Sequence, residues 1–170
     1  MRYPISLVLL LIAAVIAYAH WPLEGLPEGV TANRVVVLKS ERRLQLYRGE
    51  TLLREYRVSL GFNPVGTKEI EGDGKTPEGS YVIDKRNPKS QYHLSLHISY
   101  PTAEQVTKAK VKGVNPGGLI MIHGIRNGLG AIGRLHLLTD WTAGCVAVTN
   151  EDIEEIWRVV PNGTPIEIKA

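Results

Sequence analysis

The stretch "HLLTDWTAGCVAVT", residues 136–149, contains Cys145, which is the only cysteine of the 170-residue chain. A lone free cysteine is most often buried as a small hydrophobic residue. This one follows a turn of small residues, 142–144, which can leave the sulfur accessible and bring backbone N–H groups close to a substrate. The run "GCVAVT" predicts a short buried strand. Two interpretations of Cys145 therefore stay open, a packing residue or a nucleophile, and a partner group must decide between them.

A histidine at the end of a second apolar run is the best candidate for that partner. "GGLIMIHG", residues 117–124, predicts a buried strand, Leu119 to Ile122, that ends at His123 and is followed by Gly124. A thiol with a pKa of about 8.5 is mostly protonated at neutral pH, and a nearby imidazole can accept its proton. A structural, hydrogen-bonded histidine is the alternative interpretation. His136 is a competing partner, although its segment "LHLL" is more typical of packing.

Two further histidines have the spacing of a helical zinc site but lie in a strand-like segment. In "YHLSLHIS", residues 92–99, apolar residues alternate strictly with His93, Ser95 and His97, which predicts a strand. Four residues of a strand span roughly 13 Å, so the two imidazoles cannot share a zinc ion whose bonds are near 2 Å. We therefore expect no metal site.

The first twenty residues predict export. "MRYPISLVLLLIAAVIAYAH" combines Arg2 with an apolar run from Ile5 to Ala19. This run is shorter than the ~20 residues that span a membrane and suits the apolar region of a secretory signal. The A-x-A pattern at 17–19 would make His20 the new N-terminus, whereas an uncleaved N-terminal membrane anchor is the alternative. In either case we expect the rest of the chain to lie in the periplasm or cell envelope, beyond a linker at 21–33.

The remainder of the chain is patterned mainly for strands, with turns such as Gly49-Glu50 between them. Thr149 and Asp152 have capping-box spacing and open a predicted helix whose apolar residues recur at helical spacing as far as Val160. A short surface helix is predicted at 101–110. The class is therefore mostly β with minor α. The predicted strands lie at 34–40, 43–49, 51–61, 81–84, 92–99, 119–122, 144–149 and 164–169.

Composition excludes two broad classes. The chain is 44% hydrophobic and 22% charged, which is typical of a folded domain and not of a disordered one. Its net charge of +3 comes from scattered lysines and arginines, and no nucleic-acid-binding module is present in the sequence. We therefore expect no nucleic-acid partner.

Several motifs together are specific to one family. The pair "IMIHG … TAGCVAVT", which contains His123 and Cys145, resembles the L,D-transpeptidase catalytic domain, also called the YkuD domain. Three other stretches support the resemblance, "KSERRLQLYRGETLLREYRVSLG", "GDGKTPEGSYVI" and "PNGTPIEI". The resemblance covers roughly residues 34–169. It implies one catalytic domain with a β-sandwich or barrel fold and a short C-terminal helix before the last strand.

The resemblance also implies a reaction and a role for each residue. Cys145 would attack a peptidoglycan stem tetrapeptide after its third residue, form a thioester and release the terminal D-alanine. His123 would be the proton acceptor and donor, oriented by the carbonyl of Gly124, with backbone N–H groups around Gly144 and Cys145 as an oxyanion hole. No cofactor is implied. The acceptor would be the amine of a second wall peptide or of a lipoprotein.

The sequence departs from the usual family motif "S-H-G-C-[IV]-R". Thr142 replaces the serine and keeps a hydroxyl, Ala143 replaces the histidine, and Ala147 stands where the arginine would be. Loss of that cation implies that substrate carboxylates are bound elsewhere or that the preferred substrate differs. Two alternatives to a transpeptidase therefore stay open, a peptidoglycan hydrolase that uses the same pair and a non-catalytic wall-binding domain.

Overall fold

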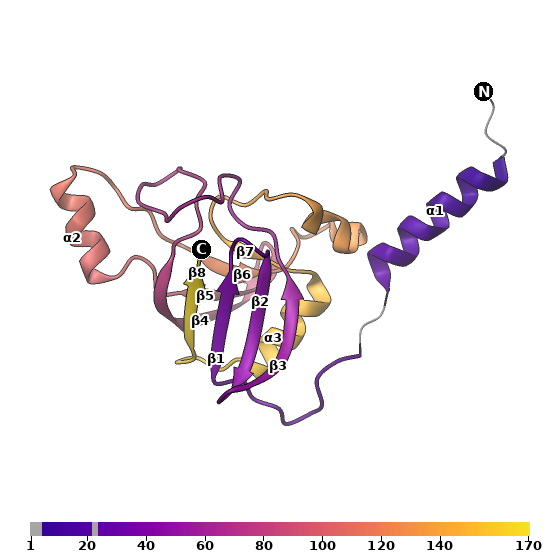
Figure 1. Ribbon diagram of the computed structural model, residues 1–170, viewed down its shortest axis with the longest axis horizontal. Helices are drawn as coiled ribbons and strands as arrows, with labels where there is room; N and C mark the ends of the chain where they lie inside the picture. The colour runs from indigo at the N-terminus through magenta and orange to yellow at the C-terminus, as the bar shows by residue number, and fades with distance from the viewer. Residues whose placement is uncertain (1–4, 22–23) are drawn as a thin grey trace.

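The computed structural model describes residues 5–21 and 24–170, and its centre is one curled sheet of eight strands (Figure 1). Neighbouring strands are antiparallel except for β1 with β8 and β6 with β7, which are parallel. The predicted class, mostly β with minor α, is confirmed. In spatial order the strands are β3 (Thr51–Arg57), β2 (Arg43–Arg48), β1 (Arg34–Leu38), β8 (Pro165–Lys169), β4 (Gly79–Ser90), β5 (His93–Ile98), β6 (Met121–His123) and β7 (Val146–Ala147).

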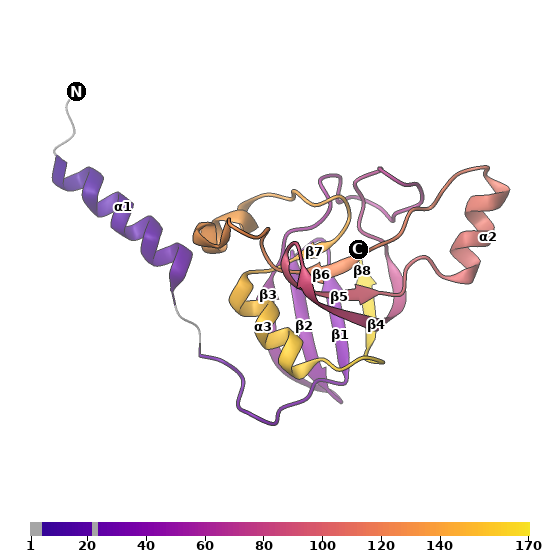
Figure 2. The ribbon, with the colours of Figure 1, turned by 180° about the vertical axis from the view of Figure 1, so that it is seen from behind.

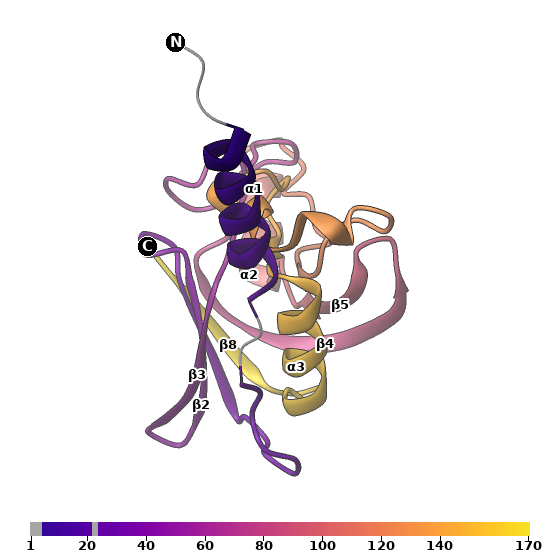
Figure 3. The ribbon, with the colours of Figure 1, turned by 90° about the vertical axis from the view of Figure 1, so that its right-hand side faces the viewer.

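The long strand β4 belongs to both halves of the sheet. Its first part, Gly79 to Val82, pairs with β8, and its second part, from Ile83 onwards, pairs with β5. The register shifts between Ile83 and Lys85, and such a bulge bends the strand and increases its twist. Figure 3 shows β4 sweeping from β8 to β5, so that the two halves face each other.

The two ends of the sheet meet at β7. Beyond the end of β3, Ser59 pairs antiparallel with Ala147. The N–H of Ser59 donates to the carbonyl of Ala147 at 2.9 Å, and the N–H of Ala147 donates back at 2.8 Å. The predicted β-sandwich or barrel is thus a curled sheet. Its edge strand β7 is bonded to the residues that follow the opposite edge strand, β3.

Helix α3 (Asn150–Val159) lies inside the curl and packs on β5, as Figures 2 and 3 show. Thr149 caps it by accepting the N–H of Asp152 at 3.1 Å. Ile153 and Ile156 are fully buried in the core, and each such side chain contributes roughly 1.5–3 kcal/mol. The predicted C-terminal helix before the last strand is confirmed.

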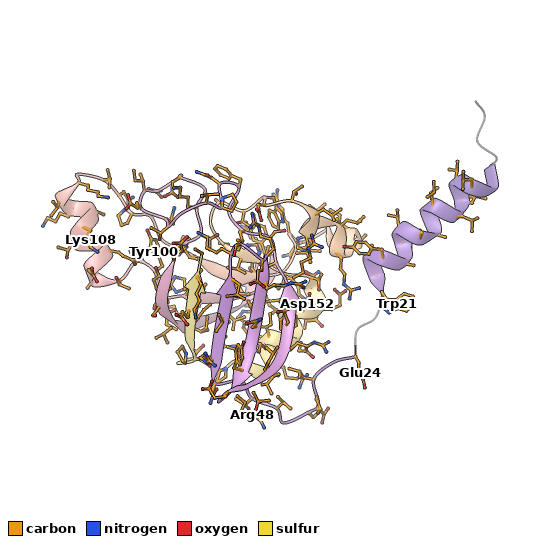
Figure 4. All side chains as sticks on the ribbon, in the orientation of Figure 1. Trp21, Glu24, Arg48, Tyr100, Lys108 and Asp152 are labelled. Atoms are coloured by element: carbon orange, nitrogen blue, oxygen red, sulfur yellow. The ribbon has the colours of Figure 1, made fainter. Side chains whose placement is uncertain are left out.

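Helix α1 (Ile5–His20) projects away from the sheet, and its last turn contacts the rest of the domain (Figure 1). There the His20 ring donates from Nε2 to the carbonyl of Ala131 at 3.1 Å, within the 3₁₀ segment η1 (Gly130–Leu138). Figure 4 places Trp21 at the end of this helix. No helix among the described residues is long and apolar enough to cross a membrane. Arg2 of the predicted signal and residues 22–23 of the predicted linker lie outside the described residues.

The predicted surface helix is α2 (Ala103–Val111), which Thr102 and Gln105 cap with a reciprocal capping box. It projects at the opposite side of the sheet from α1, where Figure 4 labels Lys108.

Several predicted strands have different bounds. The strand predicted at 51–61 ends at Arg57, and the strand predicted at 144–149 is only Val146–Ala147. The strand predicted at 81–84 lies in the first half of the longer β4. The strand predicted from Leu119 begins only at Met121, because Leu119 has a φ of +55° and is 74% exposed. A residue in the left-handed region cannot continue the ladder.

Candidate active site

Cys145 and His123 lie on the same face of the sheet, at its two shortest strands. β6 and β7 run parallel, with Ile122 opposite Val146 and His123 opposite Ala147. Side chains alternate along a strand, so Cys145, which directly precedes β7, points to the same face as His123. Ile122 and Val146 are fully buried on the other face. One parallel register thus places the predicted nucleophile and the predicted base on the same face of neighbouring segments.

His123 is held in one tautomer with one nitrogen left to act. Its Nδ1–H donates to the carbonyl of Gly124 at 2.7 Å, so Nε2 is the nitrogen that can accept a proton. Burial lowers the pKa of the imidazole below its ordinary 6.5, although the bond to Gly124 raises it. His123 is therefore neutral at pH 7.

Aromatic rings surround the imidazole. The ring centroid of Tyr92 lies 4.6 Å from that of His123, and that of Trp141 lies 5.8 Å away, edge-on. The indole N–H of Trp141 donates to Nδ1 of His136 at 3.3 Å. Burial, and then the charge of His123, lower the pKa of His136 to about 4. The predicted competitor, His136, is thus a neutral residue bonded to Trp141. The rings of Tyr92 and Trp141 also line a cavity of about 440 Å³.

The thiol of Cys145 is partly exposed and bonded to the strand beside it. It donates to the carbonyl of Leu119 at 3.6 Å, and the N–H of Met121 donates to the sulfur. Burial raises the pKa of the thiol above its ordinary 9.0, while the Met121 N–H and the charge of Lys68 lower it. A raised thiol pKa and a lowered imidazole pKa make the resting pair a neutral thiol and a neutral imidazole.

This protonation state predicts a pH profile. Since the pKa of His123 lies below 6.5, the acid limb of the acylation rate should have its midpoint below pH 6.5. Since the pKa of Cys145 lies above 9.0, alkylation of the thiol by iodoacetamide should rise steeply only above pH 9. Intact-mass measurements of alkylation rate against pH check this. A rate plateau between pH 5 and 7 would instead show a resting thiolate–imidazolium pair.

Thr142 shapes the turn that carries the thiol. Its Oγ1 donates to the carbonyl of Cys145 at 2.8 Å and accepts the N–H of Gly144 at 3.1 Å. Gly144 has a φ of +132°, and a Cβ there would lie 2.5 Å from the carbonyl oxygen of Lys75. Because the N–H of Gly144 is already bonded, it is not free for the predicted oxyanion hole. The N–H of Cys145, for which residues 5–21 and 24–170 supply no partner, is the remaining candidate.

Thr142→Val should loosen this turn, because valine keeps the shape of threonine but removes the hydroxyl. Two backbone groups then lose a buried partner, which costs about 1–3 kcal/mol of the free energy of unfolding. We expect the acylation rate to fall by roughly 10-fold or more, since the thiol is no longer held in position. Thr142→Ser is the matched control and should retain both the stability and the acylation rate of the parent protein. Denaturant unfolding and acylation kinetics measure the two effects, and equal behaviour of both variants would contradict the role.

The loop that contains "GDGKTPEG", residues 72–79, lies against the turn at 142–144, because the carbonyl of Lys75 approaches Gly144. Gly61 donates its N–H to Oγ1 of Thr76 at 3.1 Å. Lys39 is only 2% exposed, and its Nζ donates to the carbonyls of Gly66 and Thr76 and to the carboxylate of Glu78, at 2.6, 3.0 and 2.8 Å. This buried lysine joins the end of β1 to the loop. Nothing in the sequence indicates this burial, because a lysine after a strand is usually exposed.

A second buried lysine brings positive charge near the thiol. Lys68 donates to Asp73 at 2.8 Å and to the carbonyl of Ile70 at 2.9 Å. Partial burial raises the pKa of Asp73, but the bonds from Lys68 and from three backbone N–H groups lower it to about 2. Asp73 therefore stays ionised and fixes the ammonium that lowers the pKa of Cys145.

The structure gives the two histidines of β5 separate partners. His93 is bonded to Glu154 at 2.7 Å, and His97 to Asp84 at 2.6 Å. No group of three or more His, Cys, Asp or Glu side chains that could hold a metal occurs within the described part of the chain.

Comparison with known proteins agrees with this fold. The family model of the L,D-transpeptidase catalytic domain matches residues 32–168. The YafK protein of Escherichia coli K12 is 31% identical over 132 residues, which are 74% of this chain and 46% of YafK. The helical cell shape determining protein Pgp2 of Campylobacter jejuni (K307A mutant) is 26% identical with a TM-score of 0.61, over 83% of this chain and 48% of that one.

A more distant structure shows the same fold. The L,D-transpeptidase of Mycobacterium smegmatis superimposes with a TM-score of 0.53 at 14% identity, over 82% of this chain and 59% of that one. The curled eight-stranded sheet is thus the architecture of an L,D-transpeptidase domain. The chain belongs to the L,D-transpeptidase (YkuD) family. It spans about half the length of YafK and of Pgp2.

Proposed function

We propose that this protein is a cysteine-dependent L,D-transpeptidase that acts on peptidoglycan stem tetrapeptides through a thioester acyl-enzyme. The observation that carries the proposal is the shared face of Cys145 and His123, set by the parallel register of β6 and β7. The family acts on peptidoglycan peptides, and the alignment with it covers this whole region.

In the first half-reaction Nε2 of His123 takes the thiol proton, and the sulfur of Cys145 attacks the carbonyl between the L-centre of diaminopimelate and D-alanine. The C–S bond forms and the C–N bond breaks, and the D-alanine nitrogen takes the proton from His123. The N–H of Cys145 stabilises the charge on the carbonyl oxygen. The tautomer fixed by Gly124 leaves Nε2 available for both transfers.

In the second half-reaction an amine attacks the thioester. His123 takes a proton from the amine as the new C–N bond forms, and the thiolate that leaves takes it back. An amine on a second stem peptide gives a wall cross-link, and an amine on a lipoprotein gives protein attachment. Water in place of the amine gives hydrolysis on the same pair.

We further propose that residues 34–169 form the catalytic domain and that it works outside the inner membrane, in the periplasm or cell envelope. The substrate lies there, and residues 5–20 form the apolar helix expected of an export signal.

Mass-spectrometric analysis of muropeptides tests the proposed reaction. The protein is incubated with tetrapeptide-rich peptidoglycan, with Cys145→Ala as the control. We expect dimers linked between two diaminopimelates, present only with the unmodified protein. Shortened or released stems without dimers, still dependent on Cys145, would assign the hydrolase instead. An unchanged muropeptide profile would contradict both and leave the wall-binding domain.

A further inference from the structure

A cavity of about 270 Å³ reaches from Leu119 and Met121, which lie beside Cys145, across the sheet to β4. Leu119 and Met121 line its near end, and both bond to the sulfur through their backbones. The remaining lining residues lie on β4 and β5 and are mainly polar or basic; they include Lys85, Asn87, Ser95 and His97.

The strand registers place Lys85 and Cys145 at opposite ends of one row of cross-strand neighbours that runs from β4 to the start of β7. Lys85 is opposite His97, His97 is opposite Met121, and Met121 neighbours Cys145. Three steps of about 4.8 Å separate the two backbones by roughly 14 Å. The flexible lysine stem spans roughly 6 Å, so an ammonium that leans along the row toward the thiol would lie about 8 Å from the sulfur. An extended peptide covers that distance in between two and three residues.

The neighbouring row of paired residues, Asn87, Ser95 and His123, contains a hydroxyl without a hydrogen-bond partner. Ser95 is opposite His123, is 1% exposed, and its Oγ has no hydrogen-bond partner among the described residues. Buried hydroxyls are almost always bonded, and leaving one unbonded is unfavourable. A polar ligand in the cavity would supply the missing partner.

Lys85 is the cation that this cavity leaves available. The side chain of Arg86 stacks on Trp157 at 3.9 Å and donates to its carbonyl. His97 is bonded to the carboxylate of Asp84 on β4. The side chain of Lys85, which lines the cavity, makes no hydrogen bond or ion pair among the described residues. Ala147, which replaces the family's arginine, is fully buried and provides no charge.

We propose that this cavity binds the acyl-donor peptide and that Lys85 binds one of its carboxylates, with Ser95 as a further hydrogen-bond partner. The inference rests on the proposed function, because it assigns the substrate contacts of the same site. The stem has two carboxylates on the acyl side of the attacked bond, the α-carboxylate of the γ-linked D-glutamate and the side-chain carboxylate of diaminopimelate. Both are about two residue lengths from the attacked carbonyl. In this proposal Lys85 of β4 binds the substrate carboxylate, in place of an arginine side chain at position 147.

Binding of the synthetic tetrapeptide L-Ala-γ-D-Glu-meso-diaminopimelate-D-Ala to the Cys145→Ala protein tests the proposal without turnover. We expect Lys85→Met to raise the Kd by about 10-fold, and Lys85→Arg to keep it within about 3-fold. Lys89→Met, an exposed lysine of β4 outside the cavity, is the control and should leave the Kd unchanged. A Kd that Lys85→Met leaves within about twofold, or no binding by the parent protein, would overturn the proposal.

Amidated peptides identify the carboxylate. One peptide carries D-isoglutamine in place of γ-linked D-glutamate, and a second carries an amidated diaminopimelate side chain. We expect one of them to bind weakly and with a Kd that no longer depends on Lys85. If both amidated peptides stay sensitive to Lys85→Met, the proposal is wrong, because the remaining D-alanine carboxylate lies on the leaving side of the attacked bond.

Ser95→Ala provides a readout that a structural role would not give. Because the hydroxyl has no partner among the described residues, its removal should leave the Tm unchanged or raise it, while the Kd for the tetrapeptide rises about 3-fold. A lowered Tm with an unchanged Kd would contradict the assignment. All these measurements are independent of the acyl acceptor, so a hydrolase result in the muropeptide assay leaves the carboxylate assignment standing.

Discussion

Replacing Cys145 with alanine is expected to abolish acyl-enzyme formation and to lower the turnover rate by at least ~10³-fold. The thioester requires a thiol, and Cys145 is the only cysteine in the chain. The fold should survive, because the core face of this segment is built by Val146 and Val148, which are fully buried and unchanged. Intact-mass spectrometry of the acyl-enzyme and a thermal unfolding curve check both expectations.

His123→Gln is the companion to this variant. Glutamine is also polar but cannot accept the thiol proton, so the acylation rate should fall while the sulfur stays chemically present. Iodoacetamide at pH above 9 should therefore still label Cys145 in His123→Gln. Turnover by Cys145→Ala that equals that of the parent protein would remove the cysteine mechanism altogether.

Gly61→Ala is expected to have the second largest effect. A Cβ at Gly61 would lie 2.1 Å from the carbonyl oxygen of Gly74 and 3.0 Å from Cα of Gly144. Both neighbours are backbone, and one belongs to the turn that carries the thiol, so the chain must shift to admit the methyl group. We expect a loss of about 2–3 kcal/mol in the free energy of unfolding. The acylation rate should also fall by roughly 10²-fold, because a displacement near 1 Å misaligns the nucleophile.

Gly118→Ala is the control for that variant. Its Cβ would meet nothing closer than Pro101 at 3.8 Å, which is an ordinary contact. Denaturant unfolding of the two variants side by side should show a clear loss only for Gly61→Ala. Similar stabilities would mean that the loop around Gly74 yields easily and does not fix the nucleophile turn.

The sequence predicted the elements whose pattern is local. The alternation in 92–99 predicted β5, and the helical spacing after Thr149 predicted α3. The strands predicted at 119–122 and 144–149 correspond to β6 and β7, although β6 begins two residues later than predicted and β7 is only Val146–Ala147. The active-site roles of His123 and Cys145 remain predictions that the variants above test.

What the sequence did not show depends on pairing between distant segments. The row from Lys85 to Cys145 follows from the bulge in β4 and from two strand registers, neither of which is encoded near Lys85. The bond from Gly144 to Thr142 is a matter of turn geometry, so the oxyanion hole was predicted too broadly. The aromatic neighbours of His123 were not predicted. Trp141 directly precedes the turn 142–144, and this position close to Cys145 in the sequence could have indicated it.

The pairing of β7 on both flanks has a consequence for the specificity of the fold. A strand that slips by one residue turns every side chain to the opposite face. In β7 such a slip would turn the thiol into the core and move Val146 out of the core to the face of His123. Here β6 fixes the register on one side and Ser59 fixes it on the other, so a slip has to break both sets of hydrogen bonds at once. A strand of only two residues is thereby confined to the single alignment in which Cys145 faces outward.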